Sequence, residues 1–316
     1  MPIAISASLA YDHIMNFPDS FKNHIMPEQL HILNVSFAVD RLERTWGGNS
    51  ANIAFPIKML GGNPIIISAV GKKDGQEYID YLRGHGLETK YIQVDENQLT
   101  ASAYITTDAD DNQITAFFGA PLKLAENIDI RNIKDQISLL IVGPTHSGVM
   151  MKHLKEGYEA GIKTVFDPGQ QIIAFNKIEL RKMIGQCDFV IGNDYEIKLL
   201  QQRTEWNSNE ILDQVKAMII TLGEKGSIVC AKGEDAVEVG SCPVQSCDDP
   251  TGAGDSYRAG FFTGYELGYS WKVCAQMGAV AAAYAVEEYG TQIMFTKEQF
   301  CERYKKTFSE EISLER

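Results

Sequence analysis

The sequence has 316 residues, of which 44% are hydrophobic and 22% are charged, a composition typical of globular proteins. Its formal net charge of −13 argues against nucleic-acid binding, because that function needs a clustered basic face. No stretch approaches the ~20 apolar residues of a membrane-spanning helix, and the first residues lack the basic start of a signal peptide. A cytoplasmic protein is therefore expected.

The six cysteines are scattered along the sequence, without a CxxC pair or a Cys/His spacing typical of a metal site. Reduced thiols are the expected state of such cysteines in the cytosol. Cys242 and Cys247 are the one close pair in the sequence, and a disulfide between them stays open at this point.

The first part of the chain alternates apolar runs with helical patterns. Residues 3–9 and 64–70 are apolar runs suited to buried strands. Helices are predicted over residues 49–60, where apolar side chains recur at helical spacing, and over residues 74–85, which glycines close.

Segments rich in Thr, Tyr and Phe predict a second, smaller sheet, drawn from about residues 11–40 and 91–120. Polar and apolar side chains alternate in them, and residues 108–112 form a hairpin turn. The strands assigned to this sheet are residues 11–16, 31–37, 91–94, 100–107 and 113–118.

From residue 139 onwards, strands and helices alternate regularly. The predicted strands are residues 139–142, 163–166, 189–191, 217–221 and 227–230. Two strongly helical segments, residues 254–267 and 271–288, and an amphipathic C-terminal helix follow. This alternation predicts one α/β domain over residues 1–316, with a doubly wound, mostly parallel sheet that binds ligands outside the carboxyl ends of its strands.

The segment Thr251-Gly252-Ala253-Gly254-Asp255 opens the first of these two helices. Small residues let a ligand approach the backbone, and the free N–H groups of a first helical turn favour an anion such as a phosphate. A carboxylate at that place can accept a proton from a hydroxyl that attacks phosphorus. The spacing alone fits an ordinary helix start equally well.

Three further segments can likewise be explained by a structural role or by a role in ligand binding. Gly47 and Gly48 lead into a helix, and helix capping explains Asn49 but not Asn52. Asn193 and Glu196 follow a strand, either as a capping box or as groups that orient the waters of a Mg²⁺ ion. The glycines of residues 221–226 make a hairpin turn or let phosphates approach the backbone. The sequence contains neither a Walker P-loop nor a Rossmann fingerprint.

Taken in order, these four segments resemble the ribokinase-like (PfkB) superfamily of carbohydrate and nucleoside kinases, with an early GGxxxNxA, an NxxE, a TxGxxG and a late TGAGD. The resemblance covers the whole chain and is greatest to bacterial adenosine kinases. Further segments that carry it are residues 9–18, 34–40, 167–171, 249–260 and 290–292.

The resemblance implies an ATP-dependent kinase that phosphorylates the 5′-hydroxyl of a nucleoside, with adenosine the expected substrate, and a small β-sheet that acts as a lid. Asp255 would be the base, and Gly252, Ala253 and Gly254 would form the anion hole. The residues implied for the nucleoside are Ser8, Asp12, Ser36, Gly48, Asn52, Phe117 and Gln171, with Gln170 beside the last of these.

The same resemblance implies sites for ATP and for cations. Asn193, Thr221, Gly223 and Gly226 would border ATP, and Glu196 would act on Mg²⁺ through water. A K⁺ site is common in the superfamily, and the residues that match it are Asp249, Thr251, Val286 and Gly290.

Two departures from the adenosine kinase pattern bear on the nucleobase pocket. Ala103 stands where the related enzymes carry a base-facing Phe, and residues 118–121 read Phe-Gly-Ala-Pro where Tyr-Pro-Gly-Ala is usual. A wider pocket could admit other nucleosides or a sugar, so a broad-specificity nucleoside kinase and a sugar kinase of the ribose or fructose type stay as alternatives. A non-catalytic nucleoside sensor is disfavoured, because a sensor does not need the base Asp255.

The exposed edges of the lid sheet also offer a surface that a second copy of the chain could cover, so a homodimer is an open expectation.

Overall fold

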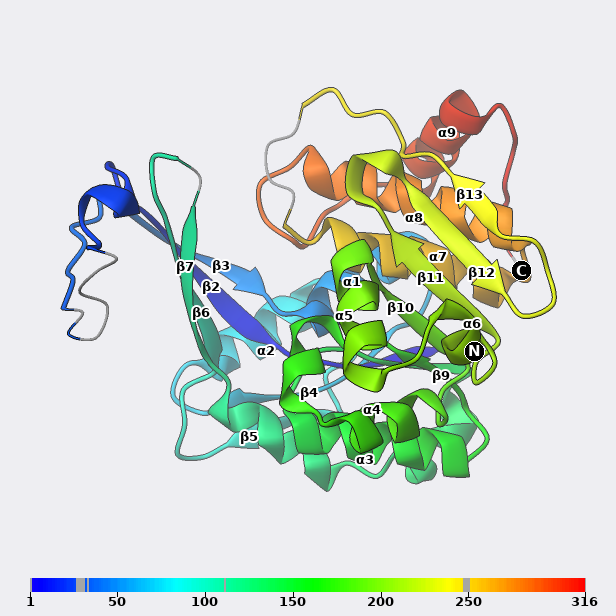
Figure 1. The fold of residues 1–316 in the computed structure, drawn as a ribbon, viewed down its shortest axis with the longest axis horizontal. Helices are drawn as coiled ribbons and strands as arrows, with labels where there is room; N and C mark the ends of the chain where they lie inside the picture. Colours follow the sequence, from blue (N-terminus) through cyan, green and yellow to red (C-terminus); the bar gives the residue numbers. More distant parts are fainter. Residues whose placement is uncertain (1, 27–31, 33, 111, 247–250, 316) are drawn as a thin grey trace.

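The computed structural model describes residues 2–26, 32, 34–110, 112–246 and 251–315, and two β-sheets organise this part of the chain. The larger sheet has nine strands among the described residues, in the order β13-β12-β11-β10-β9-β8-β1-β4-β5. Figure 1 shows the smaller sheet projecting from the main body that the larger one forms.

The larger sheet is mostly parallel, as predicted, because its strands from β5 to β11 all run in one direction. Only β12 and β13 at one edge are antiparallel to their neighbours. The strands are β1 (Ile3–Ser6), β4 (Ile65–Gly71), β5 (Ile92–Asp95), β8 (Leu139–Val142), β9 (Lys163–Phe166), β10 (Phe189–Asn193), β11 (Ala217–Thr221), β12 (Ser227–Ala231) and β13 (Val237–Val239).

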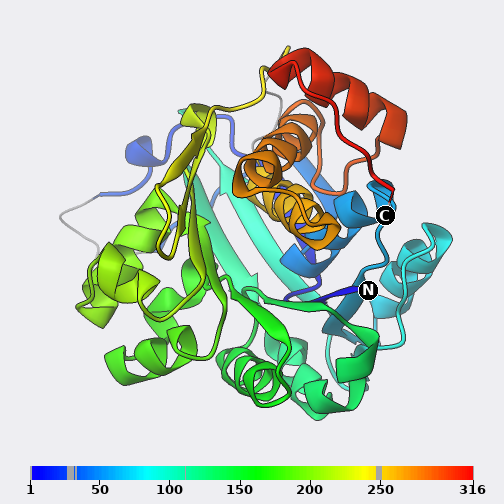
Figure 2. The same ribbon diagram turned by 90° about the vertical axis from the view of Figure 1, so that its right-hand side faces the viewer.

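Helices cover both faces of this sheet, and Figure 2 shows the two groups on either side of it. One group contains α1 (Asn49–Met59), α2 (Gly75–Gly84), α7 (Ala253–Leu267) and α8 (Trp271–Val286). The other contains α3 (Ser147–Glu159), α4 (Lys177–Ile184), α5 (Asp194–Thr204) and α6 (Ser208–Leu212). Helix α9 (Lys297–Phe308) packs on the outer side of α8.

The pleat of the strands explains why both groups find an apolar surface. Ile3 and Ile5 of β1 belong to the core under the first group of helices, whereas Ala4 belongs to the core under the second. The central strands are therefore mostly apolar, which is typical of parallel strands that are covered on both faces.

The smaller sheet has the order β3-β2-β6-β7. Its strands are β2 (Ala10–Asn16), β3 (Arg41–Gly47), β6 (Ala101–Thr107) and β7 (Gln113–Phe118). Strand β2 begins four residues after β1 ends, and β3 leads directly into α1. The sheet is thus attached to the main body at the carboxyl end of β1.

Two strands assigned to the smaller sheet from the sequence are wrong. Of the strand predicted at residues 31–37, residues 31 and 33 lie outside the described residues, and residues 34–37 have no regular secondary structure. The fourth strand is instead β3. Phe37 packs in an aromatic cluster with Phe17 and Phe21, so its apolar character does not reflect a strand pleat. Residues 91–94 overlap β5, which pairs with β4 in the larger sheet.

Other expectations are met or modified. The strands expected at residues 139–142, 163–166 and 217–221 are confirmed at those residues, whereas β13 was not predicted. Cys242 is a free thiol, and Cys247 lies outside the described residues. Within the described ranges, no helix is long and apolar enough to cross a bilayer.

A buried histidine ties α3 to β1. The Nδ1 atom of His153 lies 2.7 Å from the Ser6 hydroxyl, and its Nε2 atom lies 3.2 Å from the carbonyl oxygen of Ile128. The carbonyl can only accept, so Nε2 carries the proton and Nδ1 accepts from Ser6. Burial lowers the pKa of His153 to about 4, because the site disfavours the charged ring.

Because the pKa of His153 is lowered in the folded protein, we expect the protein to be less stable in mild acid. Below pH 6.5 the unfolded chain protonates His153 while the folded protein does not, so the free energy of unfolding falls as the pH drops towards about 4. We expect wild type to lose about 2 kcal/mol more than His153→Gln between pH 7.5 and pH 5.0. Urea unfolding of both proteins at the two pH values measures this difference, and equal losses would contradict it.

Candidate active site

The start of α7 lies at the carboxyl edge of the larger sheet, where the chemistry-bearing segments were expected to meet. Gly252 precedes the helix with φ 80°, a left-handed conformation that glycine adopts at little cost. A Cβ atom on Gly252 would lie 3.0 Å from the side chain of Thr291. The first turn of α7 thus begins against the Thr291 segment, with its free N–H groups at the helix start.

Asp255 lies in this first turn and is held by two amides from α1. Asn49 donates from Nδ2 to Oδ1 of Asp255, and Asn52 donates from Nδ2 to Oδ2, each at 2.9 Å. The Asp255 residue is only 7% exposed. Both carboxylate oxygens therefore accept hydrogen bonds, which favours the ionised form of this group.

Helix capping was one of the two readings left open for Asn49, and this reading is wrong. The capping position belongs to Gly48, and the Asn49 side chain reaches Asp255 instead. Gly48 has φ 90°, and a Cβ atom there would lie within 2.8 Å of the backbone of residues 8–10. This close approach brings the end of β1 against the start of α1, and it explains why the position needs glycine.

A buried ion pair lies one turn further along α7. Arg258 contacts Asp167, which follows β9, through Nε to Oδ2 at 2.5 Å and through one terminal nitrogen to Oδ1 at 2.7 Å. Both side chains are nearly inaccessible, at 8% and 1%. Sequence reasoning did not assign Arg258 a role, although its position three residues after Asp255 places it on the same side of the helix.

The charges of this region act on one another. Burial raises the pKa of Asp255, the guanidinium of Arg258 lowers it, and the carboxylate of Asp167 raises it. Burial likewise raises the pKa of Glu196, with a further contribution from Asp167. Three carboxyl groups thus share one arginine at the carboxyl edge of the sheet.

The residues expected to hold the acceptor fall into two sets. Ser8, Asp12 and Asn52 lie close to the Gly47–Gly48 turn: Ser8 donates to Asn49 Oδ1 at 3.2 Å, and Asp12 lies against Gly47. The second set is closer to the surface. Ser36 is exposed, Phe117 is 53% exposed on β7, and Gln171 is partly buried in a 3-10 helix (Gly169–Ala174).

The residues expected on the ATP side lie along neighbouring strands. Asn193 ends β10 opposite Thr221, the last residue of β11. Asn193 and Glu196 form a capping box on α5, with two bonds of 2.8 Å, so the structural reading of this motif is confirmed. Gly223 and Gly226 lie in the turn between β11 and β12.

The expected cation site is only partly described. Thr251 precedes α7, Val286 ends α8, and Gly290 lies in the turn after α8, but Asp249 lies outside the described residues. The described ranges contain no group of three His, Cys, Asp or Glu side chains that could hold a metal ion by themselves.

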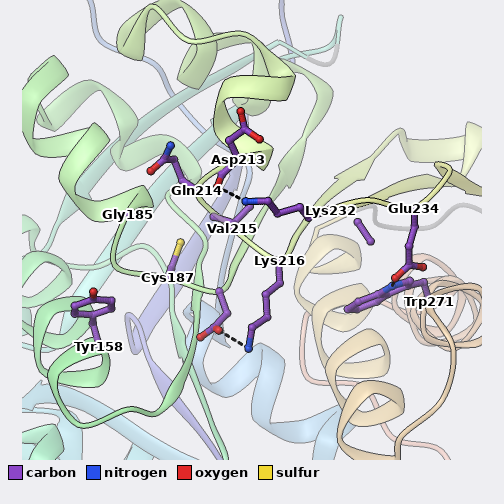
Figure 3. A pocket seen from close by; sticks show the side chains of 12 residues that line it. Tyr158, Gly185, Cys187, Asp213, Gln214, Val215, Lys216, Lys232, Glu234 and Trp271 are labelled. Atoms are coloured by element: carbon purple, nitrogen blue, oxygen red, sulfur yellow. Dashed lines mark hydrogen bonds and ion pairs between the residues drawn. The ribbon is translucent and has the colours of Figure 1, made fainter.

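A cavity of about 620 Å³ lies at the amino ends of strands β10 and β11, and Figure 3 shows the side chains that line it. Asp188 and Lys216, which precede β10 and β11, form an ion pair of 2.8 Å there. Lys232 donates to the carbonyl oxygen of Asp213. The cavity contains none of the motif residues described above.

Comparisons with known proteins agree with this arrangement. Residues 8–298 match the model of the pfkB family carbohydrate kinases. A nucleoside kinase of Methanocaldococcus jannaschii is 32% identical over 262 residues, which cover 82% of this chain and 85% of the relative. A ribokinase of Haemophilus influenzae is 27% identical over 305 residues, which cover 92% and 94% of the two chains.

A solved structure extends the likeness to three dimensions. The nucleoside kinase of Burkholderia thailandensis in complex with inosine has a TM-score of 0.89 and 34% identity, and the match covers 98% of this chain and 99% of the other. A second structure of the same enzyme, in complex with ADP-inosine, has a TM-score of 0.86. The ribokinase-like α/β fold with a small separate sheet is therefore confirmed.

The buried ion pair generates a stability prediction. Arg258→Met leaves Asp167 buried without its cation, and we expect the free energy of unfolding at pH 7.5 to fall by about 3–5 kcal/mol. Arg258→Lys keeps the charge and should lose less. Chemical unfolding measures both variants, and the loss in Arg258→Met should shrink at lower pH, where stranded carboxylates can take up protons. A loss in Arg258→Met no larger than in Arg258→Lys would contradict this assignment.

Proposed function

Since this chain belongs to the pfkB family of carbohydrate kinases, we propose that it transfers the γ-phosphoryl group of ATP to the 5′-hydroxyl of a nucleoside. The observation that carries this proposal is the carboxyl group of Asp255 at the start of α7, with each of its oxygens 2.9 Å from an amide nitrogen of Asn49 or Asn52. A base and an anion-binding helix start are thus side by side.

The reaction needs both features at once. The acceptor oxygen forms a bond to the γ-phosphorus while the bond from that phosphorus to the β–γ bridging oxygen breaks and ADP leaves. The hydroxyl proton passes to Asp255, and the N–H groups of Ala253 and Gly254 stabilise the charge on the phosphoryl oxygens. Removing a general base costs about 10²–10⁴-fold in rate.

The proposal of a nucleoside as acceptor rests on relatives and on the expected pocket. The two nucleoside kinases above are at least 32% identical to this chain, and one was solved with inosine. Asp12, Gly48 and Asn52 would hold the ribose, with Ser8, Ser36, Phe117 and Gln171 on the nucleobase side. We propose adenosine as the preferred nucleoside, because the residues that carry the resemblance are those of bacterial adenosine kinases.

The donor side supports ATP with Mg²⁺. The Burkholderia enzyme was solved with ADP-inosine. In this chain Asn193, Thr221, Gly223 and Gly226 would border the nucleotide. The carboxyl groups of Asp167, Glu196 and Asp255 all interact with the guanidinium of Arg258, and carboxylate oxygens are typical ligands of Mg²⁺.

The cations would be held in different ways. Mg²⁺ typically binds through one or two carboxylates, waters and phosphates, so Glu196 would hold it through water. When bound, Mg²⁺ neutralises charge on the phosphates. K⁺ would bind near Thr251, Val286 and Gly290, beside the start of α7.

The second candidate is a sugar kinase, which the ribokinase of Haemophilus influenzae favours. Phe117 separates the two candidates, because its exposed ring on β7 could stack on a nucleobase but has no partner on a pentose. In both cases the smaller sheet would act as a lid that excludes water from the phosphoryl group.

A substrate panel tests the acceptor. With MgATP, we expect kcat/KM for adenosine and inosine to exceed that for ribose or fructose by about 100-fold or more. Ring stacking and each hydrogen bond to the base contribute about 0.5–1.5 kcal/mol, and these contributions add up. ADP formation is measured with each acceptor, with and without K⁺. Equal turnover across the panel would refute the nucleoside assignment, and higher turnover of ribose would favour the sugar kinase.

A substitution of the base tests the mechanism. Asp255→Asn should lower kcat by about 10²–10⁴-fold, because the amide cannot take the hydroxyl proton, whereas nucleoside affinity should be largely kept. Asp235→Asn, an exposed carboxylate in the turn before β13, is the matched control. Steady-state kinetics and calorimetric binding separate the two effects, and full activity of Asp255→Asn would remove this residue from the mechanism.

A further inference from the structure

The residue behind Asn52 is Thr291, which lies just after the turn that follows α8. Its hydroxyl lies 2.7 Å from Oδ1 of Asn52 and 3.2 Å from the carbonyl oxygen of Trp46. The Thr291 residue is 4% exposed. The methyl group of Thr291 packs against Gly252 at the start of α7. Thr291 therefore contacts the acceptor side and the anion hole at once.

The hydrogen bonds settle which way the Asn52 amide points. A carboxylate only accepts, so the group of Asn52 that faces Asp255 must be the NH₂ group. The Oδ1 atom then faces Thr291 and must accept the hydroxyl proton of that residue. The opposite orientation would place two acceptor oxygens against each other at 2.9 Å, the distance that separates Asn52 and Asp255.

The other oxygen of Asp255 is held in the same way. Ser8 donates its hydroxyl proton to Oδ1 of Asn49, and the NH₂ group of Asn49 then donates to Asp255. Each carboxylate oxygen thus meets an amide whose orientation a hydroxyl fixes. Two independent chains of the same construction converge on one carboxylate, which argues that amide orientation matters at this site.

We infer that Thr291 is a positioning residue, which orients Asn52 so that its NH₂ group holds the carboxylate of Asp255 for proton transfer. This inference rests on the proposed function, because it assigns Asp255 the role of base. One N–H of Asn52 is used by Asp255, and the second can donate to an acceptor hydroxyl. Without Thr291 the amide can rotate, and both contacts weaken together.

Thr291→Val and Thr291→Ser test this role. Valine keeps the methyl group that packs on Gly252 but removes the hydroxyl, whereas serine keeps the hydroxyl. We expect Thr291→Val to lose about 5- to 10-fold in kcat/KM for the acceptor, the scale of one hydrogen bond, with KM for ATP unchanged. Thr291→Ser should stay within about twofold of wild type on the same scale.

The pH profile gives a second readout. Burial raises the pKa of Asp255, and the hydrogen bonds from Asn49 and Asn52 oppose this by lowering it. Activity needs the ionised base and is lost as the pH falls through this pKa. The acid limb of kcat/KM should therefore move to higher pH in Thr291→Val and stay in place in Thr291→Ser.

A double-mutant cycle with Asn52→Ala distinguishes positioning from a general structural role. If Thr291 acts through Asn52, Thr291→Val has no further effect in the Asn52→Ala background. The inference would be overturned if the losses of the two single variants in kcat/KM multiplied in the double variant, or if Thr291→Val were as active as wild type. Thermal unfolding of each variant tests whether the folded state is kept.

A measurement without substrate separates this inference from the proposed function. The side-chain ¹H–¹⁵N signals of Asn52 are assigned by their absence in Asn52→Ala and followed by NMR. They should shift in Thr291→Val and return in Thr291→Ser. Unchanged signals in Thr291→Val would refute the orienting role even if the enzyme is active. If the signals shift in Thr291→Val but the wild-type protein phosphorylates none of the acceptors, the orienting role of Thr291 stands and the proposed function is refuted.

Discussion

The contact between the amides of α1 and the carboxylate of Asp255 is the interaction on which the site depends. Asn52 and Asp255 are 203 positions apart in the sequence, yet their side chains meet at 2.9 Å. A buried carboxylate is costly unless hydrogen bonds satisfy it, and here Asn49 and Asn52 satisfy both oxygens. The same bonds therefore stabilise the packing of two distant helices and hold in place the carboxyl group that the proposed function assigns as the base.

Around this contact, the carboxyl groups outnumber the guanidinium that interacts with them. Arg258 pairs with Asp167 and also lowers the pKa values of Asp255 and Glu196, so one guanidinium serves three carboxyl groups. Under the proposed function, these carboxyl groups would face the cation of a metal-bound nucleotide, while the helix start beside them would favour its phosphates.

The sequence predicted most of the fold, because alternation of apolar runs and helical patterns is local information. Strands β8, β9 and β11 lie where that pattern predicted them. Residues 34–37 and 91–94 were misassigned because alternation does not say which sheet a segment joins, and Phe37 is apolar for aromatic packing. Asp255 and Asn52 could be found as motif residues. Thr291 and Arg258 could not, since their roles exist only through contacts made across the fold.

Two further hydrogen bonds constrain how the smaller sheet can move. Tyr78 of α2 donates to the carbonyl oxygen of Gly47 at 2.6 Å, and Gln292 donates to the Tyr78 hydroxyl at 2.7 Å. The end of β3 is thereby tied to α2 and to the segment after α8. A closing motion that kept these bonds would leave Gly47 in place and bend the strands beyond it. The residues next to this turn that are proposed to hold the acceptor would then stay aligned with Asp255 while the outer part of the sheet moves.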